Sequence, residues 1–106
     1  MSADNGIYIA EFPKADGTVE YRVSEAGAID NVLLSYRPMS EERIRLEDAH
    51  RVLYFGDARS FSDKKEAGLY ALELSEERYT EYGVAHIKMD RPLVEMTSDE
   101  AMAVLR

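Results

Sequence analysis

The two histidines are the first residues to test for chemistry, because imidazole binds metals and moves protons near neutral pH. Glu47 and His50 lie three residues apart, the spacing that carboxylate di-iron bundles use on their metal-binding helices. Those bundles need two such pairs and further glutamates, whereas this sequence holds one pair. His86 lies in an alternating segment, on the side that carries Val84 and Lys88. The sequence therefore predicts surface histidines and no metal site.

Motifs for catalysis and nucleotide binding are absent from the sequence. It contains no cysteine, and neither G-x-x-x-x-G-K-[ST] nor G-x-G-x-x-G nor G-x-S-x-G occurs. Serines that might act as nucleophiles fall where helix caps are expected: Ser24, Ser40, Ser62 and Ser98. We expect no catalytic residue, no enzymatic activity and no cofactor.

A row of acidic side chains is the most informative feature. At about 100° per residue on a helix, Glu66, Glu73 and Glu77 fall within about 40° of one another, and Glu76 lies on the same flank. With a rise of about 1.5 Å per residue, neighbouring carboxylates in the row are roughly 10 Å and 6 Å apart. These distances are near the spacing of phosphates along a nucleic-acid strand.

Two leucines, Leu69 and Leu72, border this acidic row. An exposed helix of this kind can dock on a basic groove of another protein, with the leucines as anchors and the acids steering the approach. Two alternatives stay open: the acids serve solubility, and the leucines pack on the C-terminal segment or across a homodimer. The candidate partner-binding residues are Glu66, Leu69, Leu72, Glu73, Glu76 and Glu77.

A β-hairpin is expected at the start of the chain. Residues 6–12 are rich in β-branched and aromatic side chains and are followed by Pro13, and residues 18–23 alternate between apolar and polar. Between them, Asp16 and Gly17 supply the backbone freedom of a tight reversal. Two antiparallel strands are therefore predicted.

After the hairpin, the pattern of apolar and polar residues becomes less regular. Ser24 is expected to cap a short helix over residues 25–30. Residues 31–36 are too few to distinguish a strand from the end of a helix.

A helix is predicted between Ser40, as its N-cap, and Gly56, as its C′ residue. Its apolar face is expected to comprise Leu46, Ala49, Val52 and Leu53. Its charges are interpreted as a solvated face with ion pairs between residues four apart: Glu41, Glu42, Arg43, Arg45, Glu47, Asp48 and Arg51.

A short strand over 58–61 and a second helix over 63–78, capped by Ser62, are predicted next. The core face of this helix is expected to comprise Ala67, Tyr70, Ala71 and Leu74. A strand over 82–89 follows, and Ser98 is expected to cap a short terminal helix. Inward positions are assigned to Ala85, Ile87 and Met89 in the strand and to Ala101, Met102 and Leu105 in the helix.

This order of elements predicts an α+β fold, because the strands do not alternate regularly with helices. We expect a small, mostly antiparallel sheet, formed by the N-terminal hairpin and the late strand, with the two main helices packed on one face. The 106 residues are expected to form a single domain.

Charge and hydropathy narrow the class of partner. The chain has 21 acidic residues against 13 lysines and arginines, a net charge of −8 that opposes direct binding to nucleic acid or anionic lipid. It has no long apolar run and no basic stretch followed by an apolar one near residue 1. A cytoplasmic protein without membrane contact is therefore expected.

Several segments together resemble a group of small uncharacterised proteins encoded by bacteriophages, prophages and related mobile elements. The most specific segment is Ala-Asp-Asn-Gly-Ile-Tyr-Ile-Ala-Glu-Phe at residues 3–12. The others are residues 21–23, 28–31, 54–57, 61–67 and 81–84. The group has no established activity, so the resemblance implies only a setting: small acidic phage proteins often bind host nucleases and defence complexes, and some present carboxylates where DNA phosphates would lie.

The leading hypothesis is a phage-type accessory protein that binds a host protein with a basic surface and inhibits a nucleic-acid-handling or defence system. One alternative is a small-ligand-binding protein or minor enzyme with a pocket around Asp4, Asn5 and the sheet face bearing His86. Another is a structural or assembly protein that acts as a homo-oligomer through Leu69 and Leu72.

Overall fold

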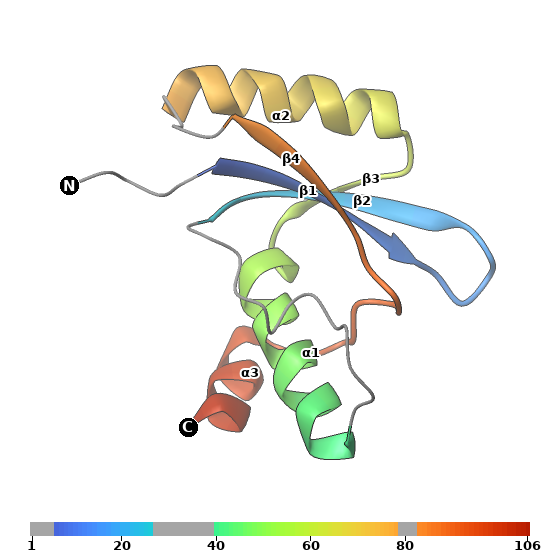
Figure 1. Cartoon of the computed structure of the whole chain (residues 1–106), viewed down its shortest axis with the longest axis vertical. Helices are drawn as coiled ribbons and strands as arrows, with labels where there is room; N and C mark the ends of the chain where they lie inside the picture. Colours follow the sequence, from blue (N-terminus) through green and yellow to red (C-terminus); the bar gives the residue numbers. More distant parts are fainter. Residues whose placement is uncertain (1–5, 27–39, 79–82) are drawn as a thin grey trace.

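A four-stranded sheet with helices on both faces forms the body of the protein (Figure 1). The structure, a computed structural model, describes residues 6–26, 40–78 and 83–106. The strands are β1 (Gly6–Pro13), β2 (Val19–Ala26), β3 (Arg59–Phe61) and β4 (Val84–Lys88). The helices are α1 (Glu41–Phe55), α2 (Lys64–Arg78) and α3 (Ser98–Leu105).

The sheet has the strand order β3-β2-β1-β4. The β1–β2 and β2–β3 pairs are antiparallel, whereas β1 and β4 are parallel. The α+β class and the mostly antiparallel sheet are therefore confirmed, with β4 as the parallel exception.

The placement of both main helices on one face was wrong, because β1 is apolar on both of its faces. Ile7 and Ile9 point to the face covered by α2, while Ala10 and Phe12 point to the face covered by α1 (Figure 1). A strand buried on both faces shows a nearly continuous apolar run instead of alternation. That run, in residues 6–12, signals that both faces are covered.

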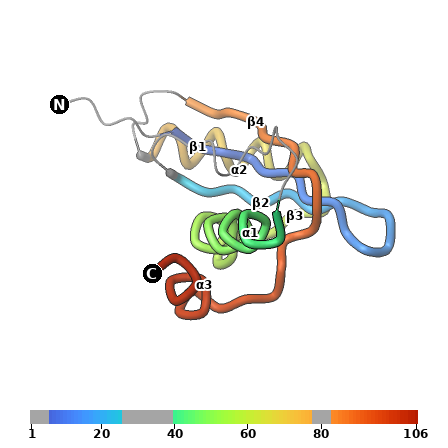
Figure 2. Tube along the Cα trace, turned by 60° about the horizontal axis from the view of Figure 1, so that its bottom comes forward, coloured from blue at the N-terminus to red at the C-terminus, as the bar shows by residue number. Residues whose placement is uncertain are grey.

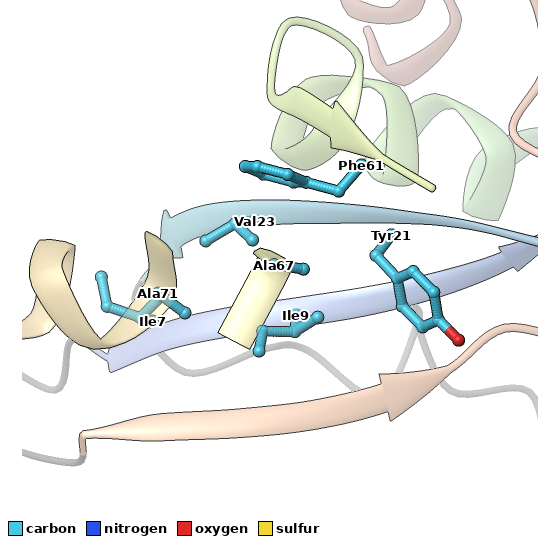
Figure 3. Packing of buried hydrophobic residues seen from close by; sticks show 7 residues of the cluster. All are labelled: Ile7, Ile9, Tyr21, Val23, Phe61, Ala67 and Ala71. Carbon is cyan, nitrogen blue, oxygen red and sulfur yellow. The ribbon is translucent and has the colours of Figure 1, made fainter. Parts of the chain in front are cut away.

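The core under α2 joins three strands to one helix. Two small side chains of the helix, Ala67 and Ala71, are completely buried and let α2 approach the sheet closely (Figure 3). Tyr70 and Leu74 pack beside them, so the predicted core face of α2 is confirmed. The sheet contributes Ile7, Ile9, Tyr21, Val23 and Phe61.

The opposite face of the sheet packs on α1. Phe12 meets Phe55 edge to face, with ring centroids 5.7 Å apart. Met89 is buried in the same cluster, as its inward assignment predicted, whereas Ala85 is exposed. Figure 2 shows α3 lying beside α1, and Ala101 is buried in that contact.

The hairpin turn has the predicted chemistry. Gly17 has a φ of 89°, a left-handed conformation that favours glycine. The Asp16 carboxylate accepts a hydrogen bond of 2.9 Å from the backbone N–H of Thr18. Hydrogen bonds from Thr18 hold the pKa of Asp16 below its usual value, because they stabilise the charged form.

The N-cap residues of α1, α2 and α3 were each predicted to within one residue. Ser40 caps α1 and accepts a hydrogen bond of 3.2 Å from the N–H of Arg43, as expected. At α2 the accepting side chain is Asp63 and not Ser62, and at α3 it is Thr97 and not Ser98. In both cases the residue next to the expected one is also a good cap, and sequence alone does not separate them.

The end of α1 depends on contacts that sequence spacing does not show. Gly56 has a right-handed φ of −59°, so it is not the left-handed C′ residue predicted. It is constrained by space instead, because a Cβ there would lie 2.6 Å from the carbonyl oxygen of Val52. Arg22 of β2 donates hydrogen bonds of 3.0 Å to the carbonyl oxygens of Phe55 and Gly56. These oxygens lie at the negative end of the helix dipole, where a positive charge is stabilising.

The helix predicted after Ser24 begins inside a strand. Ser24 belongs to β2, which continues to Ala26, so the cap assignment was wrong. The rest of that prediction, residues 27–30, and the ambiguous residues 31–36 lie outside the described residues.

Candidate docking surface on the second helix

The outward side of α2 exposes both leucines that were singled out. Leu69 is 61% exposed and Leu72 is 55% exposed, although the helix has buried positions available to apolar residues. Those positions are taken by alanines, which fit the narrow space between helix and sheet. Leu69 and Leu72 therefore do not pack on α3 or on the rest of the described chain as core residues.

The four glutamates of the candidate set, Glu66, Glu73, Glu76 and Glu77, are also exposed. No ion pair within 4.0 Å joins any of them to a basic side chain that the structure describes. Carboxylates without a local counter-charge keep their full field toward solvent and toward an approaching partner. The exposure that a docking surface requires is thus present on α2.

The candidate residues divide between two sides of the helix. Tyr70 packs on Phe61 of β3, with ring centroids 5.3 Å apart, which fixes the rotation of α2 about its axis. By helical periodicity, the three glutamates nearest to Tyr70 lie on the β3 side: Glu66, Glu73 and Glu77. Leu69, Leu72 and Glu76 lie toward β4, so Glu76 is closer to the leucines than to the row in which it was placed.

A second charged group, on α1, has a structural role that sequence reasoning missed. Leu46 and Leu53 were expected in the core but are 36% and 41% exposed, while Ala49 and Val52 are buried as predicted. Glu47 and Arg51 were expected in solvent but are 0% and 2% exposed. The helix therefore buries a pair of opposite charges beside Ala49 and Val52, while Leu46 and Leu53 lie partly in solvent.

These buried charges are neutralised by the segment after β4. Arg51 lies 3.5 Å from Glu47 and 2.8 Å from Asp90. Arg91 lies 3.4 Å from Glu47 and 3.0 Å from Asp48. Because Asp90 and Arg91 are 39 or more residues from their partners in sequence, no local spacing predicts these pairs.

The pKa values in this cluster follow from the pairing. Partial burial would raise the pKa of Asp90, but the hydrogen bond and charge of Arg51, with the charge of Arg91, hold it below its usual value. Burial likewise opposes the charge on Arg91, yet Asp48, Asp90 and Glu47 raise its pKa. The charged forms of Asp90 and Arg91 are therefore favoured, and their ion pairs fix the residues after β4 on α1.

Within residues 6–26, 40–78 and 83–106, neither histidine lies in a metal-binding group. Glu47, the partner considered for His50, is occupied by Arg51 and Arg91. Across the described ranges, no three histidine or carboxylate side chains converge as metal ligands. His86 is exposed on β4, as predicted, and Asp4 and Asn5 lie outside the described residues.

Comparison of the chain with protein-family models, with curated proteins and with solved structures finds no match. Among the described residues, no helix is long and apolar enough to cross a membrane. The interpretation of α2 therefore depends on its exposure, its charge and its neighbours.

Proposed function

We propose that this protein acts by binding another protein through the outward side of α2. The observation that carries the proposal is the pair of leucines, 61% and 55% exposed, at the centre of a helix whose exposed acids form no ion pair within 4.0 Å with a described basic side chain. Large exposed apolar side chains next to charges are typical of binding surfaces. The acids favour a partner with a basic surface and speed its approach.

The setting implied by the resemblance makes the proposal more specific. We infer a phage-type accessory protein of the host cytoplasm whose partner is a host protein that handles nucleic acid or takes part in defence. The carboxylates of Glu66, Glu73 and Glu77 match, in sign and approximate spacing, the phosphates that a basic groove of such a protein normally holds. The action proposed is occlusion of that groove, without chemistry.

Charge reversal tests the proposal directly. Glu73→Lys with Glu77→Lys is expected to abolish capture of partners from a bacterial host lysate while the circular dichroism spectrum stays native. A matched control, Glu42→Lys with Glu95→Lys, makes the same change in net charge at two exposed acids away from α2. If both double variants lose capture equally, or neither does, α2 is not the binding surface.

Self-association through the same leucines is the competing use of this surface. Light scattering of the 12.0 kDa chain separates the two uses. A dimer that dissociates on Leu69→Asp or Leu72→Asp would assign the leucines to a second copy. A monomer leaves them free for a different protein.

A further inference from the structure

The strand β4 has an open edge next to α2 (Figure 1). It pairs with β1 on one side, and in the part of the chain that the structure describes no strand lies on its other side. The Gly83 carbonyl accepts from Ile7, and the Met89 N–H donates to Glu11, so these backbone groups face β1. Because successive residues of a strand alternate, the backbone N–H and C=O groups of Val84, His86 and Lys88 face the open edge.

A groove runs along this edge between α2 and β4. Its first part is a hollow of about 360 Å³ with a mainly apolar lining, contributed by Leu69 and Leu72 of α2 and Val84 of β4. Ile9 of β1 and Gly68 of α2 also line it, and adding a Cβ to Gly68 would meet no atom within 4 Å. The groove is open to solvent and wide enough for side chains of an extended peptide.

The second part of the groove is polar and carries positive charge. It is a neighbouring hollow of about 300 Å³ that reaches from Lys64 of α2 and Lys88 of β4 across the sheet to Glu11 of β1 and Tyr21 of β2. Both hollows are lined in part by Ile9 and His86, so they lie next to each other. With Lys65 in the first part, three lysines face one carboxylate along the groove.

The single carboxylate is already engaged by a neighbour. Burial raises the pKa of Tyr21, and the charge of Glu11 and the hydrogen bond to it raise it further. Tyr21 therefore stays protonated and donates to Glu11. Among the described lining residues, three lysines outnumber this carboxylate, so the groove carries a net positive charge in a chain whose net charge is −8.

We propose that this groove binds an extended segment of a partner protein as an added strand beside β4, with apolar side chains toward Leu69 and Leu72 and acidic side chains toward Lys64 and Lys88. Strand addition of this kind uses main-chain hydrogen bonds for affinity and side-chain pockets for specificity. A second copy of β4 fits less well, because its sequence, Val-Ala-His-Ile-Lys, contains no acidic side chain to face Lys64 and Lys88. This site goes beyond the docking of α2 proposed above: it shares Leu69 and Leu72 with that surface, but its charged groups are the lysines of α2 and β4 instead of the glutamates.

Two short peptides test the proposal, Val-Thr-Val-Thr-Asp-Thr-Asp-Thr and the same residues in reverse order, each with a fluorescent label. In an added strand, valines and aspartates share one face and threonines the other. Fluorescence anisotropy is expected to show saturable binding of one orientation by the full chain. The matching peptide with lysine in place of aspartate is expected to bind at least about 10-fold more weakly.

Variants of the protein locate the peptide. Lys64→Glu with Lys88→Glu is expected to weaken binding about 10-fold or more, while the control Lys14→Glu with Arg45→Glu, the same charge change at exposed positions elsewhere, has little effect. Glu73→Lys with Glu77→Lys is expected to leave peptide binding intact, which separates this site from the acidic side of α2. N-methylation of alternate peptide residues is expected to abolish binding for one set of residues and spare the other, since only one set donates to β4.

The proposal is overturned if neither peptide orientation binds or if the lysine peptide binds as tightly as the aspartate peptide. It is also overturned if Lys64→Glu with Lys88→Glu binds the peptide as tightly as the control Lys14→Glu with Arg45→Glu. If both N-methylated peptides bind as tightly as the unmodified peptide, the peptide does not bind as an added strand. Light scattering of the free protein completes the test, because a dimer that hides β4 would place a second copy at the edge.

Discussion

The two longest helices, α1 and α2, have 15 residues each, and they use their charges in opposite ways. On α1, Glu47 and Arg51 are buried and paired, while Leu46 and Leu53 are partly in solvent. On α2 the buried positions are alanines, and the exposed side carries leucines and acids that form no ion pair with the basic side chains of the described residues. Charge on α1 therefore contributes to the fold, whereas charge on α2 is available to a partner.

The difference shows that charge content alone does not reveal the role of a helix. Both sequences are typical of amphipathic helices with many acids. The role of the charges depends on whether another segment of the chain supplies partners for them. The segment after β4 brings Asp90 and Arg91 to α1. No described basic side chain does the same for the acids of α2.

Breaking the buried pair on α1 is expected to have the largest effect. Arg51→Met leaves Glu47 buried with less compensation, and we expect the free energy of unfolding to fall by about 3 kcal/mol or more. Urea denaturation measures this loss. Glu47→Leu with Arg51→Met removes both charges and is expected to lose less than the single change; a greater loss would contradict the assignment.

Removing the arginine at the end of α1 is expected to cost less. Arg22→Ala removes the side-chain donor to the carbonyl groups of Phe55 and Gly56, although Phe55 keeps the N–H of Ala58, and we expect a loss of about 1–2 kcal/mol in the free energy of unfolding. Arg45→Ala, an exposed arginine on the same helix, serves as the control and should change stability by less than about 0.5 kcal/mol. Equal losses would mean that Arg22 does not stabilise the helix end.

Acid is expected to act on the α1 cluster through Asp90. Its pKa is lower in the folded state than in the unfolded chain, so its contribution is present above the unfolded value of 3.8 and is lost as the pH falls through the folded value. Asp90→Asn should flatten part of the decline in stability below about pH 4. An unchanged pH profile for this variant would show that Asp90 is not stabilised in the fold.

The smallest effect on folding is expected on the outward side of α2. Leu69→Asn with Leu72→Asn removes apolar groups that are already in solvent, so the free energy of unfolding should change by less than about 0.5 kcal/mol per site. Partner binding should nevertheless be lost. A large loss of stability, measured by thermal unfolding, would mean that these leucines pack in the native state.

Local patterns were sufficient to predict the hairpin, α1, α2, β4 and α3. The core face of α2 followed from the spacing of Ala67, Tyr70, Ala71 and Leu74, because helical periodicity is a local property. The division of the helices between two faces did not follow, since it depends on which side of β1 each helix reaches. The signal was available in the apolar residues on both faces of β1, Ile7 and Ile9 on one and Ala10 and Phe12 on the other.

The candidate sites, like the fold, were predictable only where the signal lies within one helix or strand. Exposure of Leu69 and Leu72 was predictable from their distance from the core face of α2 on the wheel. The groove was not, because it combines Lys64 and Lys65 of α2 with Lys88 of β4. Sequence separation hides such a cluster until the sheet order places β4 at an edge.

Site-specific crosslinking tests the role of α2 most directly, since the chain contains no cysteine that would compete for the label. A photoreactive group on Leu69→Cys is expected to crosslink a host protein in lysate, and Glu73→Lys with Glu77→Lys in the same chain should remove that product. The same group on Glu42→Cys, at the exposed start of α1, should give no such product. Identical products from both positions, or none from position 69, would contradict docking through α2.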